Sequence, residues 1–197
     1  MYIPFDDFDQ FLELKTLPRN KVHDKVIDVA RNFSELNELE ELITSAIVEP
    51  NQTPHGPAEI SDIFTLQLSH KRKFGLSAFI LKGKSFKTIK ASDISHQIFR
   101  LRKIADLKYA ILGYVGNILD PAKEEFIQTS SDLNIKYSVL DVVDFARLAI
   151  NIGLLCPKDG KKTVNGKCSC GYRIKGNQLN YLQIESLKML QETRELG

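Results

Sequence analysis

The alternation of strand-like and helix-like segments in the second half of the chain constrains the fold more than any other feature. The apolar run 109–115 predicts a buried strand, and Asp120-Pro121 predicts the start of a helix, since proline in a first turn loses no hydrogen bond. A second strand is expected at 136–140 and a second helix at 142–152. Strand, helix, strand and helix joined by short links imply parallel pairing through a crossover. The sequence therefore predicts an α/β fold.

An antiparallel hairpin precedes this alternation. The runs 62–69 and 77–82 are rich in Phe, Ile, Leu and Thr, and the polar connection between them contains a glycine. Apolar residues at helical spacing predict two further helices, at 34–47 and 92–105. We therefore expect a mixed central sheet that is flanked by helices.

The hairpin connection decides which side chains of its two strands face each other. A turn centred between Arg72 and Lys73 would place Asp62 opposite Lys82 or Gly83. Opposed residues share a face of a sheet and lie about 5 Å apart. Asp62 and Lys82 would then form a charged pair at the end of one face. The rest of that face would be apolar and consist of Phe64, Leu66, Leu68, Ala78 and Ile80.

Two more polar residues border the apolar stripes of the helices that should cover this face. Glu40 lies beside the stripe of the first helix and Gln97 beside that of the second. Their convergence with Asp62 and Lys82 would set two carboxylates beside a lysine. Carboxylate oxygens bind Mg²⁺, which polarises a phosphate and lowers the pKa of a bound water, while an ammonium group orients the charged species. This combination suits phosphodiester hydrolysis, and the simpler alternative is a surface ion pair between Asp62 and Lys82.

The segment from Leu39 to Ile152 resembles the restriction-endonuclease-like (PD-(D/E)XK) superfamily, most closely its Mrr-like branch. Residues 39–43 (LEELI) are similar to the first-helix motif of that branch. Asp62 matches the acid that opens the second strand, and residues 78–83 (AFILKG) are similar to the third-strand motif that ends in a lysine. The resemblance implies a restriction-endonuclease-like fold and a metal-dependent DNA endonuclease in a restriction or DNA-defence setting.

The resemblance also implies roles for individual residues. Glu40 and Asp62 would hold Mg²⁺. Lys82 would position or activate the attacking water, and Gln97 would assist. Cleavage of both strands often needs two active sites, so a homodimer is expected with this function. Ile80 stands where the family has an acid or a glutamine, which favours a catalytically inactive nuclease-fold module that binds DNA or a partner protein, or a regulatory module that reports to an effector chain.

Basic residues are clustered rather than abundant. The formal net charge is only +2, yet ten lysines and arginines fall between residues 71 and 103. Contacts from such residues to phosphates supply most non-specific affinity for nucleic acid. Lys84 and Lys87 are the stronger candidates, because their loop leaves the sheet at the proposed site. The alternative is a solvated, lysine-rich face.

All three cysteines lie in one short stretch near the C-terminal end. The segments Cys156-Pro-Lys-Asp159 and Cys168-Ser-Cys170 resemble a small zinc ribbon, in which two turns clamp one ion tetrahedrally. Asp159 occupies the position of the fourth ligand. Four protein ligands leave no open position for catalysis, so the zinc would be structural. The alternative is a degenerate ribbon that has lost its metal.

The order of predicted elements and motifs indicates three units, and we expect a cytoplasmic protein. We expect an N-terminal helical segment at 1–33, the nuclease-like α/β domain at 34–153, and a zinc-ribbon-like segment with a C-terminal helix at 154–197. The first residues are acidic where a secretory signal needs positive charge, and the apolar runs fall far below the ~18 residues that cross a bilayer.

Overall fold

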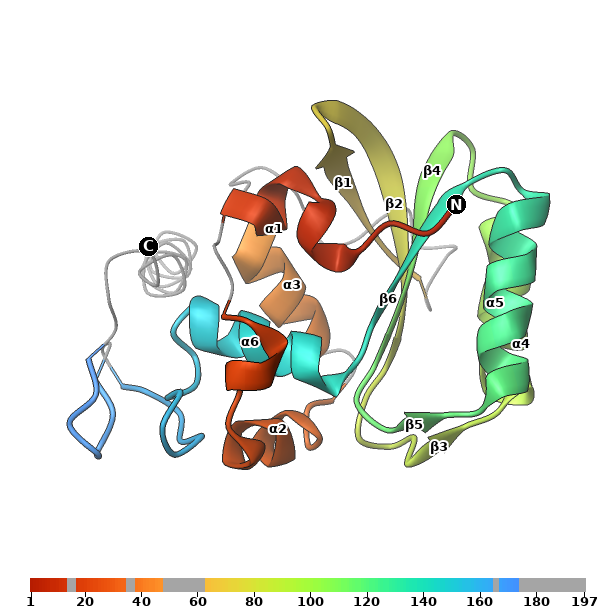
Figure 1. The fold of residues 1–197 in the computed structure, drawn as a ribbon. Helices are drawn as coiled ribbons and strands as arrows, with labels where there is room; N and C mark the ends of the chain where they lie inside the picture. Colours follow the sequence, from red (N-terminus) through yellow and green to blue (C-terminus); the bar gives the residue numbers. More distant parts are fainter. Residues whose placement is uncertain (14–16, 35–37, 48–62, 165–166, 174–197) are drawn as a thin grey trace, which may run out of the picture.

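The computed structural model describes residues 1–13, 17–34, 38–47, 63–164 and 167–173 (Figure 1). Its centre is a four-stranded mixed sheet with the strand order β1-β2-β4-β6. β1 is antiparallel to β2, whereas β2, β4 and β6 are parallel to one another. The predicted mixed α/β sheet is therefore confirmed. The strands are β1 (Phe64–His70), β2 (Lys73–Lys82), β4 (Leu107–Tyr114) and β6 (Lys136–Leu140).

Helices cover both faces of the sheet (Figure 1). One face carries α4 (Ala91–Leu101) and α5 (Asp120–Asp132), which are the crossovers between the parallel strands. The other face carries α1 (Asp9–Glu13), α2 (Asp24–Ala30), α3 (Glu40–Ile47) and α6 (Val142–Asn151). The predicted C-terminal helix lies outside the described residues.

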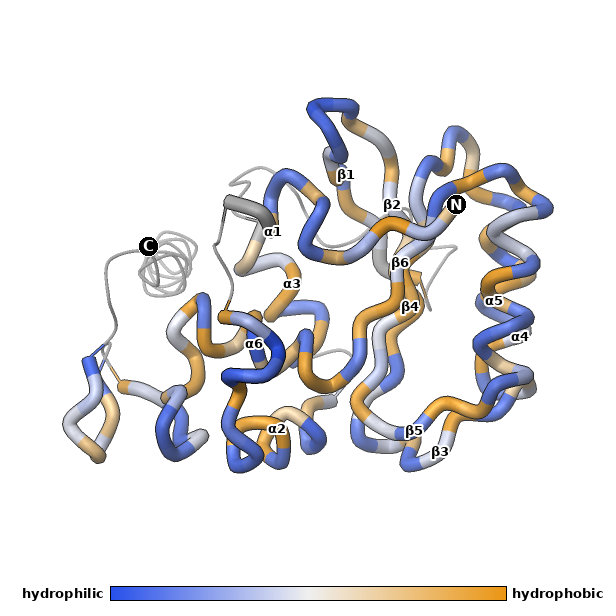
Figure 2. The backbone as a smooth tube through the Cα atoms, in the orientation of Figure 1, coloured by the Kyte–Doolittle hydropathy of each residue, from blue (hydrophilic) through white to orange (hydrophobic). Residues whose placement is uncertain are grey.

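The strands bury alternate side chains in two separate cores. Phe79 and Ile111 belong to the core beneath α3 and α6, whereas Ile80 and Leu112 belong to the core beneath α4 and α5. All four are at most 1% exposed. Burial of each such side chain is worth about 1.5–3 kcal/mol. Figure 2 shows the resulting apolar stretches along β4 and β6, and a hydrophilic tip on the β1–β2 hairpin.

The hairpin register differs from the prediction by one position. Phe64 pairs with Phe79 and His70 with Lys73, so the turn consists of Lys71 and Arg72 alone. A shift of one residue moves a whole strand to the opposite face. The predicted apolar face is therefore wrong: Leu66 and Leu68 share the α3 face with Phe79 and Leu81, and not the α4 face with Ala78 and Ile80.

A distant carboxylate explains where the turn lies. Both turn residues have positive φ (52° for Lys71 and 62° for Arg72), a conformation that rarely suits residues with a side chain. Asp9 accepts hydrogen bonds from the backbone N–H of Arg72 (2.7 Å), from that of Lys71 (3.2 Å) and from the Ser69 hydroxyl. The Ser69 hydroxyl and these amides lower the pKa of Asp9. The turn is thus fixed by a residue about 60 positions earlier in the chain.

The N-terminal segment is built into the main core. Met1 and Ile3 exchange backbone hydrogen bonds with Tyr137 on β6, at 3.0 and 2.8 Å. Phe5, Phe8 and Phe11 are at most 5% exposed and pack in the core of the α3 face. This segment covers the same face as α6, and it positions Arg19 beside the start of that helix.

Candidate functional site

The predicted hydrolytic residues lie partly outside the described chain. Asp62 is one of these undescribed residues. Lys82 ends β2, is 7% exposed, and holds its Nζ 4.4 Å from the centroid of the Phe86 ring. Glu40 begins α3 and Gln97 lies in α4; both are half-buried. The expectation that both helices cover one face is wrong, because α3 and α4 pack on opposite faces of the sheet.

A basic cleft opens where the parallel strands β2 and β4 end. It has a volume of about 290 Å³. Two sequence-distant regions supply its cations: Lys84 and Lys87 follow β2, and Arg31 follows α2. None of the described residues that line it is acidic. We call this hollow the basic cleft; its principal lining residues are Arg31, Lys84, Phe86, Lys87, Gly116 and Asn117.

Backbone hydrogen bonds hold the two loops of the cleft together. The N–H of Val115 donates to the Lys82 carbonyl at 3.1 Å, and that of Asn117 to the Lys87 carbonyl at 2.9 Å. These bonds lead into a short parallel ribbon of β3 (Thr88–Ile89) and β5 (Asn117–Ile118). The cleft therefore has a fixed backbone frame.

Gly116 permits this close approach. A Cβ atom built there would lie 2.0 Å from the Phe86 carbonyl oxygen, which is far inside van der Waals contact. Glycine is therefore the only residue that fits between the two loops without a shift of the backbone.

A further backbone bond brings Arg31 to the cleft. The Lys84 N–H donates to the Phe33 carbonyl at 2.8 Å and so joins the loop after β2 to the end of α2. Sequence reasoning did not find Arg31, since more than fifty residues separate it from Lys84 and no local pattern links the two.

The cleft carries an uncompensated positive charge. Lys84 and Lys87 are exposed, and within the described chain neither forms an ion pair. Among the described residues, the ion-pair partner of the Arg31 side chain is Asp28 of its own helix at 3.6 Å, and both side chains are over 60% exposed. Such a pair is weak in water. In α/β sheets, ligands bind outside the carboxyl ends of the parallel strands, where this cleft lies.

The four predicted zinc ligands come together in the structure. The ligand atoms of Cys156, Asp159, Cys168 and Cys170 lie within 4.8 Å of one another, so that the cluster could hold a metal ion. The Sγ atoms of Cys156 and Cys170 are 3.5 Å apart, and Cys168 Sγ is 3.3 Å from Asp159 Oδ1. A tetrahedral zinc with Zn–S bonds of about 2.3 Å would require sulfur separations near 3.8 Å.

Two turns present these ligands. Gly160, with a φ of 71°, follows the first pair, and Gly171, with a φ of 86°, follows the second. The Gly160 N–H donates to the Cys156 carbonyl and the Gly171 N–H to the Cys168 carbonyl, both at 3.0 Å. A Cβ on Gly160 would lie 2.7 Å from the Lys25 carbonyl oxygen, so the first turn packs closely on α2.

The environment gives the thiols different acidities. Burial raises the pKa of Cys156 to about 12. The backbone amide of Tyr172 and the Cys168 side chain lower the pKa of Cys170. Metal ions bind thiolates and displace the thiol protons. Metal binding at this cluster would therefore release a proton from Cys156 near neutral pH.

Comparison with known protein families, with curated proteins and with solved structures found no match. Among the described helices, none has the length and apolar character needed to span a bilayer.

Proposed function

We propose that this chain binds nucleic acid through the basic cleft. The observation that carries the proposal is the gathering of Arg31, Lys84 and Lys87 around one hollow with no acidic residue in its described lining. Lysine and arginine in such a setting bind phosphates and release counterions from the nucleic acid. The low net charge of +2 does not oppose this role, because local charge governs the contact.

Charge reversal with a matched control tests this proposal. The double variant Lys84→Glu/Lys87→Glu should lower the affinity for a fluorescent oligonucleotide by more than about tenfold. For duplex DNA, the slope of log K plotted against the logarithm of the salt concentration should become shallower by about 1.8. Lys71→Glu/Lys73→Glu makes the same charge change at the hairpin tip and should alter affinity by less than about twofold. Equal losses in both variants would show a diffuse charge effect and no binding site.

Phosphodiester hydrolysis is the second candidate function, within a restriction-endonuclease-like fold. The position of Lys82 favours it: Phe86 lines the basic cleft, and the Lys82 Nζ lies 4.4 Å from the Phe86 ring. β1 begins at the edge where β2 ends, and Asp62 precedes β1 by two residues in the sequence. In this mechanism Asp62 would hold Mg²⁺ and Lys82 would orient the attacking water; DNA is the substrate and a homodimer cuts both strands. Glu40 and Gln97 cannot both join this site, because α3 and α4 pack on opposite faces of the sheet. Ile80 is apolar where nucleases of the superfamily that this sequence resembles carry a ligand, so binding without cleavage ranks first.

Cleavage and binding are separated by one assay. Purified protein is incubated with plasmid in Mg²⁺ or EDTA beside Asp62→Asn and Lys82→Ala. A nuclease is indicated by Mg²⁺-dependent nicking that both substitutions abolish. Intact plasmid together with salt-dependent binding supports the inactive module, and equal cutting by all three proteins exposes a contaminant.

For the cysteine cluster we propose a structural zinc held by Cys156, Asp159, Cys168 and Cys170. The mutual proximity of the four ligand atoms supports it. Exposed cations on the same segment, among them Lys158 and Lys161, suit a role beside nucleic acid. One zinc per chain should be measured by elemental analysis, and Cys168→Ser should lose it. A Co²⁺-loaded protein without thiolate charge-transfer absorption would contradict this site.

A further inference from the structure

A second hollow opens along the edge strand β6, between β6 and α5. It has a volume of about 430 Å³, within the range of small-molecule sites. Three tyrosines from three separate segments line it, together with charged groups at its rim. We call it the tyrosine pocket; it is lined by Tyr2, Tyr114, Tyr137, Arg19, Lys123 and Asp141, among others.

Tyr2 and Tyr137 form a supported aromatic wall. Tyr2 packs against Tyr137 with ring centroids 5.7 Å apart, and Tyr137 in turn meets Phe126 edge-on at 6.1 Å. Tyr137 and Tyr114 are half-buried, whereas Tyr2 is 51% exposed. Burial raises the pKa of Tyr114, with the Asp141 carboxylate adding to the effect, so the phenol stays neutral. The wall thus offers flat π faces and hydroxyl donors to a planar ligand.

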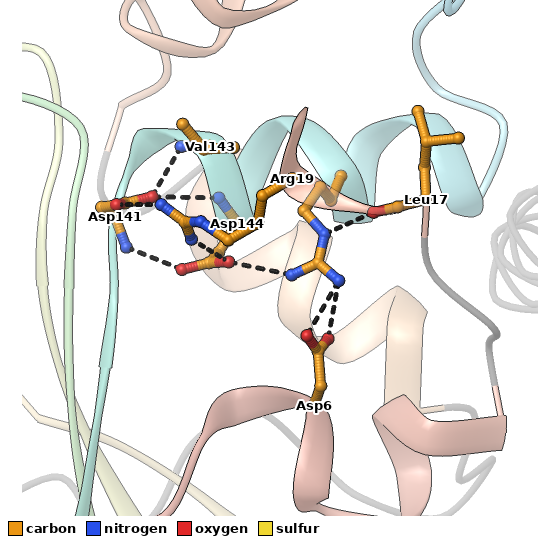
Figure 3. Close-up of polar contacts among 7 residues, drawn as sticks. Asp6, Leu17, Arg19, Asp141, Val143 and Asp144 are labelled. Carbon is orange, nitrogen blue, oxygen red and sulfur yellow. Dashed lines mark hydrogen bonds and ion pairs between the residues drawn. The ribbon is translucent and has the colours of Figure 1, made fainter. Parts of the chain in front are cut away.

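The charged rim is largely neutralised by internal pairing. Figure 3 shows Arg19 between the two carboxylates at the start of α6; its nitrogens lie 2.5 Å from Asp141 Oδ2 and 2.5 Å from Asp144 Oδ1. Arg147 reaches Asp144 from the other side at 3.1 Å. Asp141 and Arg19 nevertheless keep 34% and 47% of their side-chain exposure. The rim therefore presents an acceptor edge beside a donor edge, the combination found on the edges of nucleobases.

The pocket adjoins the basic cleft along the chain. Tyr114 ends β4 and lines the tyrosine pocket, and Gly116 and Asn117 line the basic cleft. Tyr114 and Gly116 are two residues apart, so their Cα atoms lie at most about 7 Å from each other, which is a short distance on the scale of a nucleotide. The segment 114–117 therefore joins the lining of the tyrosine pocket to that of the basic cleft.

We propose that the tyrosine pocket takes up an unpaired base of the nucleic acid whose backbone lies in the basic cleft. This inference rests on the proposed function and narrows the ligand to single-stranded or locally unpaired nucleic acid. A positive groove that follows the backbone, joined to aromatic side chains that stack the bases, is the general design of single-strand binding. In a duplex the bases are stacked on each other and cannot enter a side pocket without unpairing.

The test compares a single-stranded oligonucleotide with its duplex by fluorescence anisotropy, with 2-aminopurine as a second reporter of stacking. The wild-type protein should prefer the single strand by roughly tenfold and quench 2-aminopurine. Tyr2→Ala and Tyr114→Leu should each weaken single-strand binding roughly fivefold to tenfold and leave duplex affinity unchanged. Tyr114→Phe keeps the ring and should retain most of the affinity.

Matched controls separate this inference from the proposed function. Phe74→Ala removes a 68% exposed ring from the hairpin and should have no effect. A Tyr2→Ala variant that melts like the wild type yet binds single strands equally well overturns the base pocket. If the Lys84→Glu/Lys87→Glu variant nevertheless loses affinity, nucleic-acid binding by the basic cleft is supported and only the base pocket is rejected. Absence of binding to any oligonucleotide overturns both.

Discussion

Both ends of the sheet carry clustered cations in the sequence, but they differ in what their charges can do. At the hairpin tip, Lys71 and Arg72 form an exposed two-residue turn, and the exposed Lys73 begins β2. At the carboxyl end, Lys84 and Lys87 surround a cleft together with a distant arginine.

The two ends differ in the shape of their surface and in the negative charge beside their cations. The Asp9 carboxylate lies against the hairpin turn and accepts the backbone N–H groups of Lys71 and Arg72. At the carboxyl end, backbone bonds between two loops leave a hollow, and the described lining contributes no acid. A count of cations along the sequence therefore does not locate a binding surface, whereas the backbone frame around those cations does.

The largest expected effect comes from adding one methyl group at the carboxyl end. Gly116→Ala should lower the free energy of unfolding by about 3 kcal/mol, because the new Cβ meets the fixed Phe86 carbonyl oxygen. The same variant should lose oligonucleotide affinity as the two loops separate. Urea denaturation and anisotropy measure the two effects.

Gly75→Ala is the matched substitution toward the hairpin end. There the new Cβ meets the Cβ and Cγ atoms of Lys108 at 2.6 Å, a milder overlap than the 2.0 Å contact with a carbonyl oxygen at Gly116. A loss of about 1–2 kcal/mol with unchanged affinity is expected. Equal losses of stability and affinity in both glycine variants would remove the proposed contrast between the two ends.

A smaller effect is expected from removing the carboxylate at the hairpin. Asp9→Ala should destabilise the protein by about 1–2 kcal/mol, since the turn amides of Lys71 and Arg72 lose their acceptor. Asp7→Ala removes the same charge from an exposed neighbour and should change stability by less than about 0.5 kcal/mol. Thermal melts of both variants decide whether hydrogen bonding or charge is responsible.

The smallest effect is a pH dependence confined to the hairpin end. The pKa of Asp9 lies below its ordinary value of 3.8, because the Ser69 hydroxyl and the turn amides favour the carboxylate. A carboxyl group with a lowered pKa stabilises the fold above about pH 4, and this contribution disappears as the pH falls through the lowered pKa. The stability difference between the wild type and Asp9→Asn should therefore shrink from about pH 6 to about pH 3. Urea titrations that show a growing difference toward acid would contradict the assigned cause.

The parallel half of the sheet could be predicted almost completely from the sequence. The strand expected at 136–140 is β6, and the helix expected at 142–152 is α6 with one residue fewer. Both are specified locally, by β-branched and aromatic residues in the strand and by Asp141, whose side chain accepts the N–H groups of Val143 and Asp144 and so caps the helix. The cysteine cluster was equally predictable, because its ligands lie within fifteen residues of one another.

The sequence by itself determined the alternation of elements, the mixed sheet and the cysteine cluster, since each depends on neighbouring residues. Only the tertiary structure decided the hairpin register, because the choice between two adjacent turn positions depends on Asp9, which lies about 60 residues away. The same holds for Arg31 in the basic cleft and for the three tyrosines of the pocket. These groups meet through backbone hydrogen bonds between distant segments. Every residue except proline carries the same backbone groups, so a sequence pattern does not indicate which segments will pair.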